Sequence, residues 1–192
     1  MKKNLPLILT IVVLAASYRL LPNHIYNFTP IGAIALFSGA YLGKKAVSAF
    51  VPVAIMLISD VAIQLTGGIG FHMEMPFVYG AFLLTYFIGS KGLGGKVKPG
   101  RLFGASLIST LLFFIITNFG SWMLSPAYSK DFVGLVTCYV AAIPFYSPGD
   151  YLSSFALNGV LGDLFFTSLL FGTYYLTNKV LPKLALSKNE MV

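Results

Sequence analysis

The chain has 192 residues, of which 57% are hydrophobic and 10% charged, and its mean hydropathy is +0.82. A soluble domain carries about 25% charged residues, so this composition excludes a disordered chain, a secreted disulfide scaffold and a nucleic-acid binder. It predicts a single, all-α integral membrane domain over residues 1–192. The net charge of +7 is then expected in cytoplasmic loops. The single cysteine, Cys138, excludes an internal disulfide and a multi-cysteine metal cluster.

Six apolar stretches are candidates for transmembrane helices, each of which needs about 20 mostly apolar residues. They cover residues 5–21, 31–43, 46–65, 77–89, 102–124 and 157–176. The first also fits a cleaved signal peptide, because Lys2 and Lys3 precede it and the small residues Ala15–Ser17 lie near its end. Arg19 and the spans that follow directly favour a retained helix. The sequence therefore predicts a six-helix bundle.

A seventh apolar stretch, over residues 132–146, is about as long as half a membrane and precedes the helix-breaking run Ser147–Asp150. It predicts a short interfacial or re-entrant helix between the fifth and sixth spans.

Basic residues orient the predicted bundle. In the six-span arrangement, 11 of the 13 Lys and Arg residues fall on one side, and only Arg19 and Lys130 fall on the other. The positive-inside rule then predicts a bacterial cytoplasmic (inner) membrane protein with both termini in the cytoplasm.

Polar residues gather toward the predicted outer face. Asp60, Asp163 and Asn118 lie in the outer parts of their spans, and Arg19 ends the first span. Intramembrane ionisable residues commonly mark a substrate path or a water-filled cavity. The alternative is that Asp60 and Asp163 only support helix contacts or pair with Arg19. The predicted binding residues of an outward pocket with an apolar floor are Arg19, His24, Asn27, Asp60, His72, Tyr79, Asn118 and Asp163.

The loop His72–Met75 combines imidazole, thioether and carboxylate groups within four residues. It has no second histidine at the i+4 position, so we expect no protein-only site for a free metal ion. His72 or Met73 remains a candidate axial ligand to a metal already held in a bound cofactor.

Small residues recur every four positions at Ala35, Gly39 and Gly43. Such a row lets another helix approach closely, either within the bundle or from a partner protein. We find no His-Glu-x-x-His, Walker or Gly-x-Ser-x-Gly pattern, so we expect no enzyme and no ATP site in this chain. A weaker alternative is an intramembrane enzyme that uses Asp60 and Asp163 as paired carboxylates.

Several strings resemble an uncharacterised family of bacterial inner-membrane proteins that contains a domain of unknown function. They are Arg19–His24, Asn27–Tyr41, Ser59–Asp60, Pro76–Gly80, Thr117–Gly120, Cys138–Phe145 and Gly162–Phe166. The resemblance covers about residues 18–180, nearly the whole chain.

More loosely, the layout resembles the substrate-binding S-components of energy-coupling-factor vitamin transporters, nearest to the solitary cobalamin-transporting BtuM type. The positions that suggest it are His24, Asp60, the loop His72–Met75 and Tyr79. This resemblance implies capture of a vitamin-like micronutrient, with a corrinoid among the candidates and an ATPase-containing module as a candidate partner. A membrane scaffold that docks a partner through the row at Ala35 is the alternative.

Overall fold

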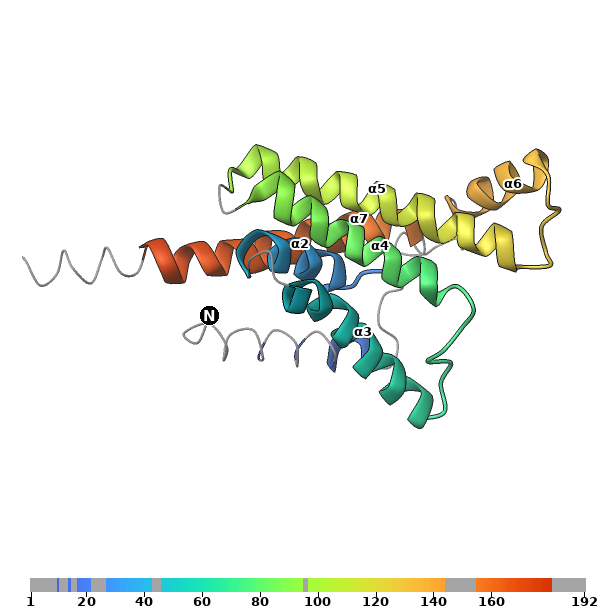
Figure 1. The fold of residues 1–192 in the computed structure, drawn as a ribbon, viewed down its shortest axis with the longest axis horizontal. Helices are drawn as coiled ribbons and strands as arrows, with labels where there is room; N and C mark the ends of the chain where they lie inside the picture. Colours follow the sequence, from blue (N-terminus) through green and yellow to red (C-terminus); the bar gives the residue numbers. More distant parts are fainter. Residues whose placement is uncertain are drawn as a thin grey trace, which may run out of the picture.

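The computed structural model describes residues 10, 14, 17–21, 27–42, 46–94, 97–143 and 155–180. Within these ranges the chain forms helices and no strand, which confirms the all-α class. In chain order (Figure 1) the elements are α2 (Ile31–Tyr41), α3 (Ala46–Leu65), α4 (Met75–Phe87), the π-helix η2 (Ile88–Leu93), α5 (Pro99–Leu124), α6 (Phe132–Ala142), α7 (Phe155–Tyr175) and the π-helix η3 (Leu176–Val180).

The short helix α2 is the centre of the bundle. Every residue from Ile31 to Ala40 is buried, and α2 contacts α3, α4, η2, α5 and α7. A helix that is apolar on all sides is stable only when other helices cover all of its faces. The apolar run that predicts a second membrane span is therefore a core helix, surrounded by protein.

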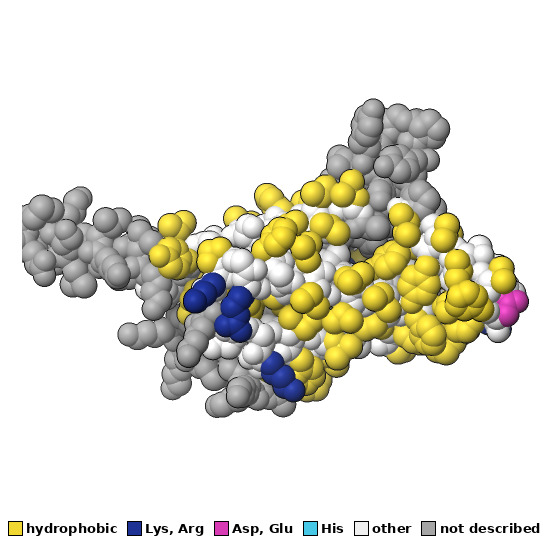
Figure 2. Space-filling model, turned by 90° about the horizontal axis from the view of Figure 1, so that it is seen from above, with side chains coloured by type: hydrophobic (Ala, Val, Ile, Leu, Met, Phe, Trp, Pro, Cys, Tyr) yellow, Lys and Arg dark blue, Asp and Glu magenta, His cyan; other side chains and the backbone are white. Residues whose placement is uncertain are grey.

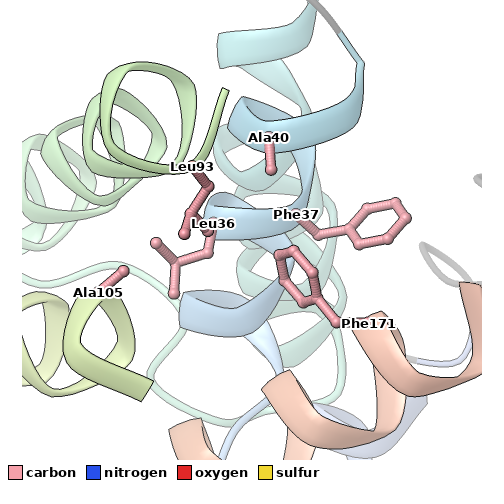
Figure 3. Close-up of a cluster of buried hydrophobic side chains, with 6 residues drawn as sticks. All are labelled: Leu36, Phe37, Ala40, Leu93, Ala105 and Phe171. Carbon is pink, nitrogen blue, oxygen red and sulfur yellow. The ribbon is translucent and has the colours of Figure 1, made fainter. Parts of the chain in front are cut away.

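Two hydrophobic clusters attach the outer helices to α2. In the first, Leu36, Phe37 and Ala40 of α2 pack with Leu93 of η2, Ala105 of α5 and Phe171 of α7 (Figure 3). In the second, Ile31 and Ile34 pack with Ile55 and Met56 of α3 and Phe82 of α4. The clusters lie at successive turns of one short helix, so α2 sets the relative positions of the longer helices.

The small residues of α2 allow close contact inside the bundle. A Cβ atom at Gly39 would overlap the backbone carbonyl of Tyr86, and one at Gly89 would overlap the carbonyl of Leu36. Ala35 is completely buried. Of the two alternatives for this row, these contacts favour packing within the bundle over a partner helix, because Gly39 lies against Tyr86 of the same chain and Ala35 is buried. Gly43 lies outside the described residues.

Three described helices are long and apolar enough to cross a membrane: Val47–Leu65, Pro99–Leu124 and Leu157–Asn178. The six-span count is not confirmed. Helix α2 has 11 residues, and α4 has 13 before it continues into η2. Most of the first predicted span lies outside the described residues.

Helix α5 exposes a continuous apolar stripe on the side of the molecule seen in Figure 2. The stripe consists of Phe103, Ile108, Leu111, Ile115, Phe119 and Met123. In water such a stripe would favour aggregation, whereas hydrocarbon solvates it. The buried residues of α5, on another face of the helix, are Ala105, Ser106, Ser109, Thr110 and Gly120.

The predicted short helix between the last two long helices is present as α6 (Phe132–Ala142). It begins at Asp131, whose carboxylate accepts a hydrogen bond from the Gly134 amide at 2.7 Å, as an N-cap residue does. Residues 144–146, the rest of the predicted segment, lie outside the described residues.

Candidate functional site

A cavity of about 700 Å³ lies among the helices. Its walls come from α2, α3, α4, α5, α6 and α7, from the segments that precede α2 and α4, and from Arg19. Small-molecule sites commonly have volumes of about 300–1,000 Å³, apolar walls and few polar groups. The aromatic wall residues Phe82, Phe113 and Phe114 fit this description.

The structure brings most of the predicted binding residues to this cavity. Five of them line it: Arg19, Asn27, His72, Asn118 and Asp163. Asp60 and Tyr79 are not lining residues but contact Arg19 or its partner. His24 lies outside the described residues.

Arg19 and Asp60 form a buried ion pair. Arg19 Nη1 lies 2.7 Å from Asp60 Oδ1, and the Asp60 side chain is only 2% exposed. The same nitrogen donates to the Ser59 hydroxyl and to the Met56 carbonyl. The Tyr79 hydroxyl donates to Asp60 Oδ2 at 2.8 Å. Both carboxylate oxygens are thus occupied, and Asp60 orients Arg19, as the alternative of pairing with Arg19 predicts.

Asp163 has a different environment. Its Oδ2 accepts a hydrogen bond from Thr110 Oγ1 at 2.6 Å, and a Cβ atom at Gly32 would collide with its Oδ1. Glycine at position 32 therefore makes room for the carboxylate between α2 and α7. Asp60 and Asp163 have separate partners, because Asp60 contacts Arg19 and Tyr79 and Asp163 contacts Thr110.

Buried hydroxyls on α5 are site features that the sequence analysis missed. Ser106, Ser109 and Thr110 occupy positions i, i+3 and i+4, which share one helix face. The hydroxyls of Ser106 and Ser109 are buried without a hydrogen-bond partner among the described residues, and Ser109 lines the cavity. The sequence signal that could have revealed them is the spacing of these three hydroxyl residues on one face of the uncharged span 102–124.

The loop before α4 contributes one interacting pair of side chains, His72 and Glu74, to the cavity wall. His72 Nδ1 lies 3.0 Å from Glu74 Oε2, and both residues line the cavity. Met73 is 71% exposed and is not a lining residue. Within the described residues, no group of three or more His, Cys, Asp or Glu side chains is arranged to hold a metal ion.

Asn118 and Asn27 reach the cavity from opposite parts of the chain. Asn118 Nδ2 donates to the carbonyl of Phe114, one turn back in α5, at 2.8 Å. Asn27 has a φ of 59°, a left-handed conformation that asparagine adopts more easily than most residues. It begins the segment that enters α2 at Pro30.

Comparison with protein families gives a match over residues 1–184. The chain belongs to DUF6580, a family of unknown function. This membership confirms the resemblance to an uncharacterised family, and it covers Arg19, Asp60 and Asp163 alike. No curated protein and no solved structure matches the chain significantly. None of the comparisons shows a resemblance to S-components, so that likeness stays a prediction.

Proposed function

We propose that this DUF6580 protein is a multi-pass protein of the bacterial cytoplasmic membrane that binds a small, vitamin-like molecule for uptake. The observation that carries the proposal is the cavity of about 700 Å³, which combines aromatic walls with a few charged groups. Its size suits a drug-sized or vitamin-sized ligand. Binding, not catalysis, is the proposed role, because the carboxylates of Asp60 and Asp163 have separate partners.

The charge distribution supports an outward-facing cavity. Exposed Lys91, Lys98 and Arg101 lie around η2 and the start of α5, whereas Asp131 follows the other end of α5. Figure 2 shows basic side chains near one end of the molecule and an acidic side chain at the opposite end. By the positive-inside rule we assign the η2 end, and with it both termini, to the cytoplasm. Helix α6 would then lie at the outer interface, and α4 with η2 would complete the membrane domain.

The cytoplasmic end of the bundle supplies the proposed apolar floor. The cluster of Leu36, Phe37, Leu93 and Phe171 fills this part of the protein, and none of these residues lines the cavity. A channel needs polar groups along its whole length, so a closed binding site is the better interpretation. An ATPase-containing module remains a candidate partner for transport, because the sequence has no Walker motif.

A matched pair of variants tests whether the cavity binds ligand. Leu107 lines the cavity, whereas its neighbour Ile108 is exposed and does not line it. The purified protein is screened by thermal shift and calorimetry against thiamin, biotin, riboflavin and cobalamin. We expect Leu107→Trp to abolish binding of the compound found and Ile108→Trp to leave it unchanged. No binding by any compound, or equal loss in both variants, would overturn the proposal.

The same screen tests the corrinoid candidate. Of the two candidate axial ligands, His72 lines the cavity and Met73 does not. If cobalamin binds through His72, its visible absorption shifts on binding, and the shift disappears in His72→Ala but persists in Met73→Ala. A shift that survives both substitutions would exclude these residues as cobalt ligands.

A further inference from the structure

Asp163 differs from Asp60 in having no counter-charge among the described residues. Asp60 is paired with Arg19 at 2.7 Å, whereas the contact found for Asp163 is the Thr110 hydroxyl. No basic side chain in the described part of the chain forms an ion pair with Asp163. Asp163 is partly buried. Removing an unpaired carboxylate from water is costly, so a positive charge or a proton from outside the described residues would stabilise this group.

The other charges at the cavity do not meet this requirement. The Arg19 charge is already balanced by Asp60, and His72 is bonded to Glu74. Among the described residues, an ionised Asp163 therefore has no positive charge at the cavity that balances it. An anionic ligand would be repelled by this charge, and a neutral ligand would leave it uncompensated.

A second acceptor lies next to Thr110, the hydrogen-bond partner of Asp163. Ser109 precedes Thr110 in α5, is 1% exposed and lines the cavity, and its hydroxyl has no partner among the described residues. A carboxylate and a hydroxyl can together accept hydrogen bonds from a group with several N–H donors. A protonated amine or an amidinium group has such donors and also carries the missing charge.

The aromatic walls suit the same kind of ligand. Phe82 and Phe113 pack with ring centroids 5.1 Å apart, and both line the cavity with Phe114. Aromatic faces attract cations when the site excludes water, in addition to burying apolar surface. The cavity lining thus combines a negative charge and hydrogen-bond acceptors with apolar and π surface.

We infer that the ligand of this cavity is a small organic cation whose protonated nitrogen pairs with Asp163 and Ser109. The inference rests on the proposed function, since it requires that the cavity bind a small molecule. It specifies the chemical class: a flat or partly aromatic body that carries one ammonium, amidinium or related cationic group.

The first test uses the full-length wild-type protein and compares ligands that differ in charge. The probes are tryptamine with its neutral alcohol analogue tryptophol, and thiamin with neutral riboflavin and anionic biotin. Calorimetry should give at least one cation that binds ten-fold or more tightly than its neutral counterpart. Equal affinity within the matched pairs, or binding restricted to riboflavin or biotin, would overturn the inference while leaving the proposed function in place. No binding by any compound would overturn both.

The second test uses variants with the cation that binds best. We expect Asp163→Asn to weaken its binding at least ten-fold and Ser109→Ala to weaken it several-fold. Asp131→Asn removes a carboxylate outside the cavity and should leave affinity unchanged. Should Asp163→Asn not fold, Ser109→Ala and the matched probes still decide the result. Unchanged affinity in both cavity variants would overturn the inference.

Discussion

The Arg19 guanidinium lies 2.7 Å from the Asp60 carboxylate, and this pair joins the segment before α2 to α3 across 41 positions of the sequence. It orients Arg19 at the cavity wall. The pair also explains why a charged residue such as Asp60 can be buried in an apolar helix, because its charge is balanced and both of its oxygens are bonded.

Removing one partner of this pair should be far more damaging than removing both. Asp60→Asn or Arg19→Met leaves a buried charge unpaired and should lower the free energy of unfolding by about 3–5 kcal/mol. The double variant Arg19→Met/Asp60→Asn should recover much of this loss. Tyr79→Phe removes one hydrogen bond to a charged group and should cost about 1.5–3 kcal/mol. Denaturant titration in detergent measures all four, and additive losses in the double variant would contradict the pairing.

The contact between α2 and the α4–η2 helix should not accept a methyl group. Gly39→Ala places a Cβ atom against the Tyr86 carbonyl and should lower stability by about 1–3 kcal/mol, because backbone cannot move aside easily. Gly104 in α5 has open space where its Cβ would be. Gly104→Ala should therefore raise stability by about 1 kcal/mol through helix propensity. Thermal unfolding of the two variants provides the comparison, and equal effects would contradict the close approach.

A second pair of glycine variants examines the position of Asp163. Gly32→Ala would displace the Asp163 carboxylate, whereas a Cβ at Gly172, which is in α7 but does not line the cavity, would meet open space. We expect Gly32→Ala to weaken binding of the cavity ligand ten-fold or more and Gly172→Ala to change it less than two-fold. Calorimetry with the compound found in the screen measures both. Unchanged ligand affinity in Gly32→Ala would show that Asp163 is not part of the binding site.

The start of α6 should lose stability in acid. The backbone N–H of Gly134 donates to the Asp131 carboxylate and, with the Ser129 hydroxyl, holds the pKa of Asp131 below its ordinary value. A folded-state pKa below the unfolded one contributes stability at pH values above the unfolded pKa of about 4. That contribution disappears as the pH falls through the lower folded-state pKa.

The Asp131→Asn variant isolates this effect. Asparagine can still cap the helix but does not titrate. We expect wild type to be the more stable protein at pH 7, with the difference in melting temperature shrinking between pH 5 and pH 2.5. A difference in melting temperature that is independent of pH would show that the negative charge of Asp131 does not stabilise the start of α6.

The predicted pocket residues show which part of the candidate site can be identified from the sequence alone. Polar side chains are expensive in an apolar chain, so Arg19, Asn118 and Asp163 could be selected from their type and depth alone, and the structure brings all three to one cavity. Their partners could not be selected in the same way. Asp60 meets Arg19 and Asp163 meets Thr110 across 41 and 53 positions, and helix packing alone determines such pairings.

The apolar composition by itself determined the all-α class, and the distribution of basic residues predicts the membrane orientation. Both follow from how single residues partition between water and hydrocarbon. Only the tertiary structure decided that residues 31–41 form a buried core helix. Protein interior and lipid are equally apolar, so hydropathy cannot distinguish a helix surrounded by other helices from one surrounded by lipid. The low charge content does not show where the few ionisable groups meet. Helix packing brings Arg19 and Asp163 to the same cavity.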